Sequence, residues 1–151
     1  MNNLMINGSG NIGFANGIHT DKDINICING SGEIQGKGFH CQNMSITVNG
    51  SGDIRLNQIQ SKKFIAEISG SGDMSFDGKT TIAEYEIAGS GDIKADNLIA
   101  ETVMANIAGS GDISCYANNK LKARVAGSGD IAFRGNPREI DAPRKNIRRI
   151  E

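Results

Sequence analysis

The sequence predicts an all-β fold, a single-stranded parallel β-helix of about seven coils with roughly 20 residues in each coil. Three observations predict it: a short motif that recurs at even intervals, an alternation of apolar and polar residues, and the composition. The chain has 151 residues, which is most simply one domain, and it combines 20 Gly with only five Phe, two Tyr and no Trp. Its apolar residues are mostly Ile, Val and Ala, which suit stacked strands better than a globular core rich in aromatic residues.

The recurring motif is Gly-Ser-Gly, followed in most copies by an acidic residue and an apolar residue. It occurs seven times, and the stretch IAGSGDI is written identically at 87–93 and 107–113. Successive copies begin 22, 20, 20, 19, 20 and 18 residues apart. A catalytic loop is needed once, whereas an even period of this length is typical of a solenoid in which each repeat contacts its neighbours. The first glycines are Gly8, Gly30, Gly50, Gly70, Gly89, Gly109 and Gly127, and the second are Gly10, Gly32, Gly52, Gly72, Gly91, Gly111 and Gly129.

Within each repeat, apolar and polar residues alternate with a period of two. In the segment 64–76, Phe64, Ile68 and Met74 share one parity with both glycines, while the polar residues share the other. The same phase holds in 44–56, 103–115 and 121–133. This period is typical of strands, and no segment carries the apolar stripe of a helix. Strands of one phase then stack in register, with Ile107, Ile113 and Val125 expected inside.

Both glycines of each motif are expected to point inward, at a tight corner where the chain passes from one sheet to the next. A side chain would crowd the stack there, and glycine also adopts positive φ at little cost. The variable segments 55–63, 75–81, 94–102 and 114–120 contain Asn, Asp, Gly and Lys. We expect them to form the turns and the third side of each coil.

An acidic column and a hydroxyl column are expected to face outward beside this corner. Carboxylates stacked about 4.8 Å apart repel one another, so each needs a compensating partner. Capping of backbone N–H groups in the same corner is favoured over a row of Ca²⁺ sites, because Asp directly follows Gly here, unlike in the Ca²⁺-binding nonapeptide repeat. The serines face no nearby base, since the only histidines are His19 and His40, which argues against a hydrolase. The two columns comprise Asp53, Asp73, Asp92, Asp112, Asp130, Ser51, Ser71, Ser90, Ser110 and Ser128.

A further outward column changes from amide to methyl side chains along the chain. Its Asn side chains are able to hydrogen-bond along a ladder, and its alanines leave a smooth strip that is either an oligomer contact or plain exposed sheet. The column is Asn7, Asn29, Asn49, Ser69, Ala88, Ala108 and Ala126.

Other motifs indicate no cofactor. The segment GSGNIG at 8–13 fits the dinucleotide-binding pattern, but no helix is expected after it to receive a pyrophosphate. Cys27, Cys41 and Cys115 lack metal-binding spacing and are expected to be free thiols, although a disulfide between two of them stays open. No run is long and apolar enough for a membrane span, and no signal peptide precedes the first motif.

The chain divides into a repeat region, 1–136, and a tail, 137–151, in which Pro143, Arg144 and Lys145 replace the glycines. We interpret the tail as a degenerate last coil that caps the stack, with a flexible basic tail as the alternative. The formal net charge is −1 and no aromatic residues interleave the C-terminal arginines, so nucleic acid is not an expected partner. The N-terminal strand has no comparable guard, which predicts a small homo-oligomer.

The NGSGDI and AGSGDI corners, followed by GNP at 135–137, resemble the bacterial auto-transporter adhesin head domain, or GIN domain. The resemblance implies a right-handed, pectin-lyase-like β-helix with GSG at the tight turn and no recognised catalytic residues. It also implies export to the periplasm or cell surface, and it favours a trimer among the possible oligomers.

Three functions follow for testing. The first is a non-enzymatic adhesion module that binds a glycan or protein along its ladders. The second is a scaffold or fibre segment, phage-like or polymerising. The third, a carbohydrate-active enzyme, is disfavoured because the segments between corners are too short to build a cleft.

Overall fold

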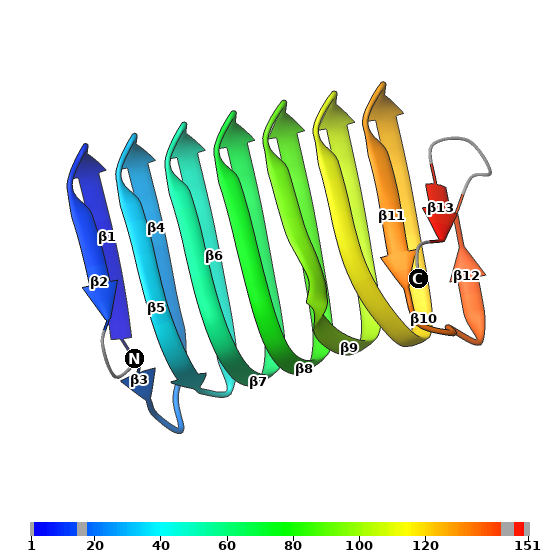
Figure 1. Ribbon diagram of the computed structural model, residues 1–151, viewed down its shortest axis with the longest axis horizontal. Coiled ribbons are helices and arrows are strands. Elements are labelled where there is room, and N and C mark those ends of the chain that lie inside the picture. The colour runs from blue at the N-terminus through cyan, green and yellow to red at the C-terminus, as the bar shows by residue number, and fades with distance from the viewer. Residues whose placement is uncertain (1, 15–17, 143–146, 150–151) are drawn as a thin grey trace.

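The computed structural model describes residues 2–14, 18–142 and 147–149, which form a flattened β-solenoid of stacked coils without a helix (Figure 1). The predicted parallel β-helix is confirmed. None of the described residues belongs to a helix long and apolar enough to cross a membrane. The strands are β1 (Asn2–Gly8), β2 (Asn11–Phe14), β3 (Ile18–His19), β4 (Ile24–Gly30), β5 (Glu33–His40), β6 (Asn43–Gly50), β7 (Asp53–Gly70), β8 (Asp73–Gly89), β9 (Asp92–Gly109), β10 (Asp112–Gly127), β11 (Asp130–Arg134), β12 (Glu139–Asp141) and β13 (Ile147–Arg149).

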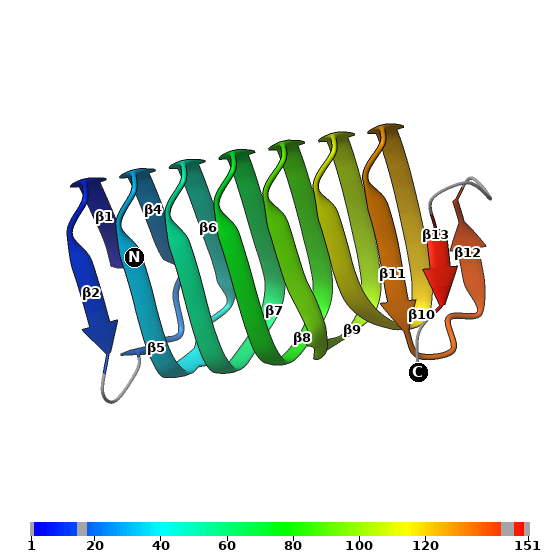
Figure 2. The same cartoon turned by 45° about the horizontal axis from the view of Figure 1, so that its top comes forward.

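Each coil contributes to two facing layers. One layer contains β1, β4 and β6 and continues through the second halves of the long strands β7 to β10 (Figure 2). The other contains β2 and β5, the first halves of the long strands, and β11. All described pairings are parallel. Each motif residue pairs with the equivalent residue of the neighbouring copy, for example Gly89 with Gly109 and Asp92 with Asp112. The sequence period is therefore the length of one coil.

The core lies between the layers as columns of like residues. Ile68, Ile87 and Ile107 occupy one column and are at most 2% exposed, as the alternation predicts. Ile93 and Ile113 belong to a second column at 1% exposed, whereas Val125 is only partly buried because it lies in the last complete corner strand. Burying each such side chain contributes about 1.5–3 kcal/mol relative to leaving it exposed.

The two glycines of a corner differ, and the expectation that both point inward is wrong for the first. The first glycine is exposed in most corners and half-buried at Gly109, where φ is +133° and a Cβ would be 2.2 Å from the Gly89 carbonyl oxygen. The second glycine is buried, and a Cβ on Gly111 would be 2.1 Å from the Gly91 oxygen and 2.9 Å from Ile87 Cγ2. Positive φ at the first glycine interrupts the strand alternation. The alternation of apolar and polar residues therefore predicted the wrong orientation for this glycine.

The variable segments do not form separate turns or a distinct third side. In β7 to β10 they belong to the same continuous strands of 16–18 residues, which bend around the end of the coil opposite the Gly-Ser-Gly corner (Figure 1). The bend is accommodated by register shifts, such as that between Leu56 and Ile59. Outside these shifts, neighbouring coils continue the strand pairing through the bend, so polar residues that usually favour turns remain in extended backbone.

The tail adds one strand to each layer. β12 pairs with β10 and β13 pairs with β11, both in parallel. The Arg124 guanidinium on β10 donates to both Asp141 carboxylate oxygens, at 3.1 and 3.2 Å, and to the Asp141 carbonyl oxygen at 3.1 Å. Pro143, Arg144 and Lys145, which were expected to block the edge, lie outside the described residues, as does Ile150.

Candidate binding surfaces

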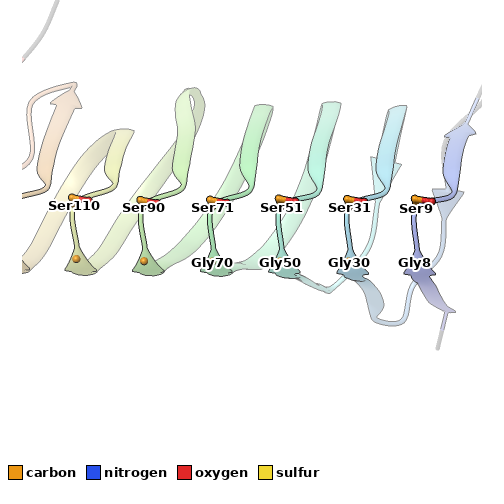
Figure 3. Close-up of a pocket in the computed structure, with 12 residues that line it drawn as sticks. Gly8, Ser9, Gly30, Ser31, Gly50, Ser51, Gly70, Ser71, Ser90 and Ser110 are labelled. Carbon is orange, nitrogen blue, oxygen red and sulfur yellow. The ribbon is translucent and has the colours of Figure 1, made fainter.

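The Gly-Ser-Gly corners line up along one long edge of the molecule, which we call the serine edge. From Ser31 onward, the backbone N–H of each serine donates to the carbonyl oxygen of the first glycine in the preceding coil, as from Ser71 to Gly50 at 2.9 Å and from Ser110 to Gly89 at 3.0 Å. The side chains are exposed and repeat along a shallow open hollow (Figure 3). Within the described part of the chain, their hydroxyls make no intramolecular hydrogen bond, so they remain available to a ligand. The edge comprises Ser9, Ser31, Ser51, Ser71, Ser90, Ser110 and Ser128.

The acidic column runs beside this edge and faces outward. The Asp92 carboxylate accepts the backbone N–H of Asp112 at 3.1 Å, and the Asp112 carboxylate accepts that of Asp130 at 3.0 Å. The expected capping within the same corner is therefore wrong for these residues, because each carboxylate caps the next coil. In the earlier coils the equivalent N–H groups, those of Asp53 and Asp73, instead donate to glycine carbonyls of the preceding coil.

Two cationic side chains lie near the acidic column. Arg55 and Lys94 line the same shallow hollow as Asp53, Asp73 and Asp92. Among the described residues, no group of three or more His, Cys, Asp or Glu side chains is arranged to hold a metal ion. The column is therefore a row of outward-facing carboxylates with Arg55 and Lys94 beside it.

The amide column forms the hydrogen-bonded ladder that its sequence predicts. Asn29 Nδ2 donates to Asn7 Oδ1 at 3.0 Å, and Asn49 Nδ2 donates to Asn29 Oδ1 at 2.9 Å. Farther along the axis, Ala88 and Ala108 replace the amides and are exposed. This face thus changes from polar to smooth and apolar between the two ends of the stack.

Sequence reasoning missed a fourth feature, which we call the bend hollow. It lies at the bend opposite the serine edge and has a volume of about 500 Å³. The strand register places His19, His40, Gln60, Lys79 and Ile99 in one column there. The two imidazole rings stack with centroids 6.4 Å apart and planes 18° apart. The detectable signal was the spacing of these residues, 21, 20, 19 and 20, which follows the coil period.

The core contains titratable groups that are held neutral. Burial, and then the nearby Asp96 charge, raises the pKa of the Cys115 thiol to about 12, and burial raises that of Cys41 to about 11. Burial also raises the pKa of Tyr85 well above its ordinary value, and its hydroxyl has no partner among the described residues. All three cysteines are free, as predicted. Thiols with such pKa values are poor nucleophiles at neutral pH, so Cys41 and Cys115 are structural.

The family described as "Putative auto-transporter adhesin, head GIN domain" matches residues 1–57 and 24–137. The chain belongs to this family. The two matched ranges overlap, which follows from a repeat that aligns equally well when shifted by whole coils. A search of curated proteins finds no match to this GIN domain.

Two solved structures share its fold. A "putative lipid binding protein" from Parabacteroides distasonis has 29% sequence identity and a TM-score of 0.83; the match covers 100% of this chain and 62% of that one. A "putative adhesin" from Bacteroides fragilis has 20% identity and a TM-score of 0.80, over 99% of this chain and 93% of that one. The GIN domain thus spans less than two thirds of the length of the Parabacteroides chain.

Proposed function

We propose that this GIN domain is a non-enzymatic adhesion module, exported to the cell surface, which binds an extended glycan or protein ligand along its serine edge. The observation that carries the proposal is the regular series of exposed, unbonded hydroxyls along the long axis. A ligand with its own repeat is able to contact several coils at once, so weak contacts add through multivalency.

The placement of the histidines supports a role without catalysis. A serine nucleophile needs a base within hydrogen-bond reach. His19 and His40 end the strands β3 and β5, and both of these strand ends lie at the bend opposite the corners (Figure 1). Neither histidine is therefore positioned to activate Ser31 or Ser51. Assays on pectin, alginate and simple esters should therefore show no turnover, and turnover lost on substitution of one edge serine would contradict the proposal.

Family membership supports the adhesive role and the surface location. The descriptions of the two related structures, one as an adhesin and one as a lipid binding protein, both concern recognition and not chemistry. The Bacteroides relative has low identity, so it supports the shared fold and leaves the ligand open.

The test is a binding screen of the purified protein on arrays of glycans and extracellular matrix proteins. We expect a ligand whose binding is lost in a Ser71→Arg, Ser90→Arg double variant, because two long cations would obstruct the centre of the edge. Asn57→Arg is the matched control, since Asn57 is exposed away from the corners and pairs with Lys37 in the neighbouring coil. Binding that survives the double variant would exclude the serine edge.

A further inference from the structure

We propose that the bend hollow is a binding site for an anionic saccharide. The site lies at the opposite end of each coil from the serine edge, so the proposal stands whether or not that edge binds a ligand. It rests on three observations: the chemistry of the lining, its dimensions, and a strained residue within it.

The lining combines several hydrogen-bonding side chains with one cation. His19 and His40 contribute imidazoles, Lys79 an ammonium group, and Gln58 and Gln60 amides. No Asp or Glu is among the described residues that line the hollow. A lining that has several donors, the Lys79 cation and no carboxylate favours a ligand that brings acceptors and negative charge.

The apolar part of the lining favours a ring-shaped ligand over a small free anion. Gly38 and Gly78 expose backbone in place of side chains, and Ile99 is half-buried beside them. The stacked imidazoles add flat ring surfaces. Three ladder steps separate His19 from Lys79, which is a span of about 14 Å at the usual spacing of neighbouring strands. Hydroxyls along such a length would meet the Gln58 and Gln60 amides, which both donate and accept.

Gln58, which lies in this bend, has a strained backbone conformation. Its φ is +57°, and it is the only residue other than glycine with positive φ among those described. Gly38, which occupies the equivalent position in the preceding coil, has φ of +86°. Glycine adopts this conformation without the steric cost that a side chain brings. Strained residues of this kind concentrate at ligand sites.

A specific contact holds the strained residue in place. The Gln58 backbone N–H donates to Asp77 Oδ1 in the next coil at 2.6 Å. This bond fixes the backbone and leaves the Gln58 amide in the lining of the hollow. We infer that the side chain is retained there for recognition, at the expense of local stability.

The experiment is isothermal titration of the protein with an oligogalacturonate, a sulfated oligosaccharide, a neutral oligosaccharide of equal length, and citrate. EDTA is present throughout, so that a metal bridging the two histidines does not contribute. We expect at least one of the two anionic saccharides to bind at least tenfold more tightly than both the neutral saccharide and citrate. Comparison of the carboxylated and sulfated ligands identifies which anion the site prefers.

The variants separate recognition from folding. Lys79→Gln should weaken binding of the anionic saccharide at least tenfold, whereas Lys94→Gln, an exposed lysine outside the hollow, should leave it unchanged. Gln58→Gly should weaken binding several-fold while the melting temperature stays equal or rises, because the strain is relieved. Equal binding of neutral saccharide or citrate, no saccharide binding at millimolar concentration, or equal losses in the two lysine variants would overturn the proposal. Unchanged affinity in Gln58→Gly would overturn the recognition role of Gln58.

Discussion

Gly109 and Gly111 are two residues apart, and a Cβ on either one would collide with a carbonyl oxygen of the preceding coil. Gly109 also needs a positive φ that side chains disfavour, whereas Gly111 needs only the space. The intervening Ser110 is exposed, so it is free to vary in structural terms. Its retention in every corner is therefore the part of the motif that folding does not explain.

Gly111→Val tests the buried position of the corner. The new side chain would collide with the Gly91 carbonyl oxygen and with Ile87, both fixed in the adjacent coil. We expect a loss of about 3 kcal/mol or more in the free energy of unfolding, measured by chemical denaturation. Gly10→Val is the matched control, because the first contact of a Cβ there is Ile6 Cγ2 at 3.8 Å. A similar loss in both variants would contradict the role of stacking.

Cys115 should make the protein sensitive to alkali. Its pKa is about 12 in the fold against 9.0 for an ordinary thiol, so burial favours the neutral form. This contribution to stability is complete below pH 9 and is lost as the pH rises toward 12, because the unfolded chain ionises first. The loss from this thiol should reach about 1.4 kcal/mol one pH unit above its unfolded pKa.

Denaturation midpoints measured from pH 7 to pH 11 check this expectation. Cys115→Ala should be less stable at neutral pH but should lose less stability between pH 9 and pH 10, where Tyr85 contributes little. The substitution keeps a small apolar residue, and the column already contains Ala95 at the paired position. Identical pH dependence in both proteins would show that the thiol does not carry the effect.

At the scale of the strand, the sequence predicts the flat parts of each coil better than the bends. Alternation places Ile113 inside and Asp112 outside, because a regular strand directs successive side chains to opposite faces. The alternation fails at Gly109, where positive φ interrupts it. The composition of the bend segments suggested turns, but strand pairing between stacked coils keeps these segments extended. The alternation also misses the capping of Asp112 by Asp92, since the partner lies in another coil.

The last coil should be the least protected element of the described structure. β12 and β13 are three residues long, and Ile140 is 53% exposed. In hydrogen exchange their amides should exchange faster than those of β8 and β9. Arg124→Ala should increase exchange in β12 by an amount equivalent to about 1 kcal/mol or less, since the ion pair with Asp141 is half-exposed.

Arg134→Ala provides the comparison for this effect. It removes an ion pair between β11 and β9, in which Arg134 Nη2 lies 3.5 Å from Asp96 Oδ2. Exchange in β12 should therefore stay as in the parent. A β12 that exchanges as slowly as β9 in every variant would show that the tail is an integral coil.

At the scale of the whole molecule, the ladders explain both what sequence reasoning found and what it missed. The serine edge is visible in the sequence because one residue type repeats in every coil. The bend hollow is hidden because His40, Gln60 and Lys79 differ in type, so they form a column only once the register is known. A search for repeated motifs therefore finds columns of one residue type and overlooks columns of different residue types.

Assembly is expected to use the two unprotected features of the solenoid. β1 pairs only with β4 among the described strands, so no described strand covers its outer edge, and Met5 on it is 60% exposed. The smooth strip at Ala88, Ala108 and Ala126 offers a second contact surface. We expect a small homo-oligomer.

Sedimentation at micromolar concentration measures the assembly directly. The mass should exceed the 16.0 kDa of one chain, and Ala108→Arg should lower it if the alanine strip forms the contact. Asn57→Arg, which adds the same charge elsewhere, should leave the mass unchanged. If the parent and both variants are monomers, the alanine strip is not an oligomer contact and is only exposed sheet.

The self-pairing of the corners also has a genetic consequence. The stretches 87–93 and 107–113 are the same heptapeptide in adjacent coils, and each coil pairs with its neighbours through equivalent residues. Unequal recombination between two such segments would add or delete one whole coil in frame while preserving the corner contacts on both sides. Each event would change the length of the molecule by about 4.8 Å. The length of the domain is thus able to change during evolution in steps of one coil while the fold stays the same.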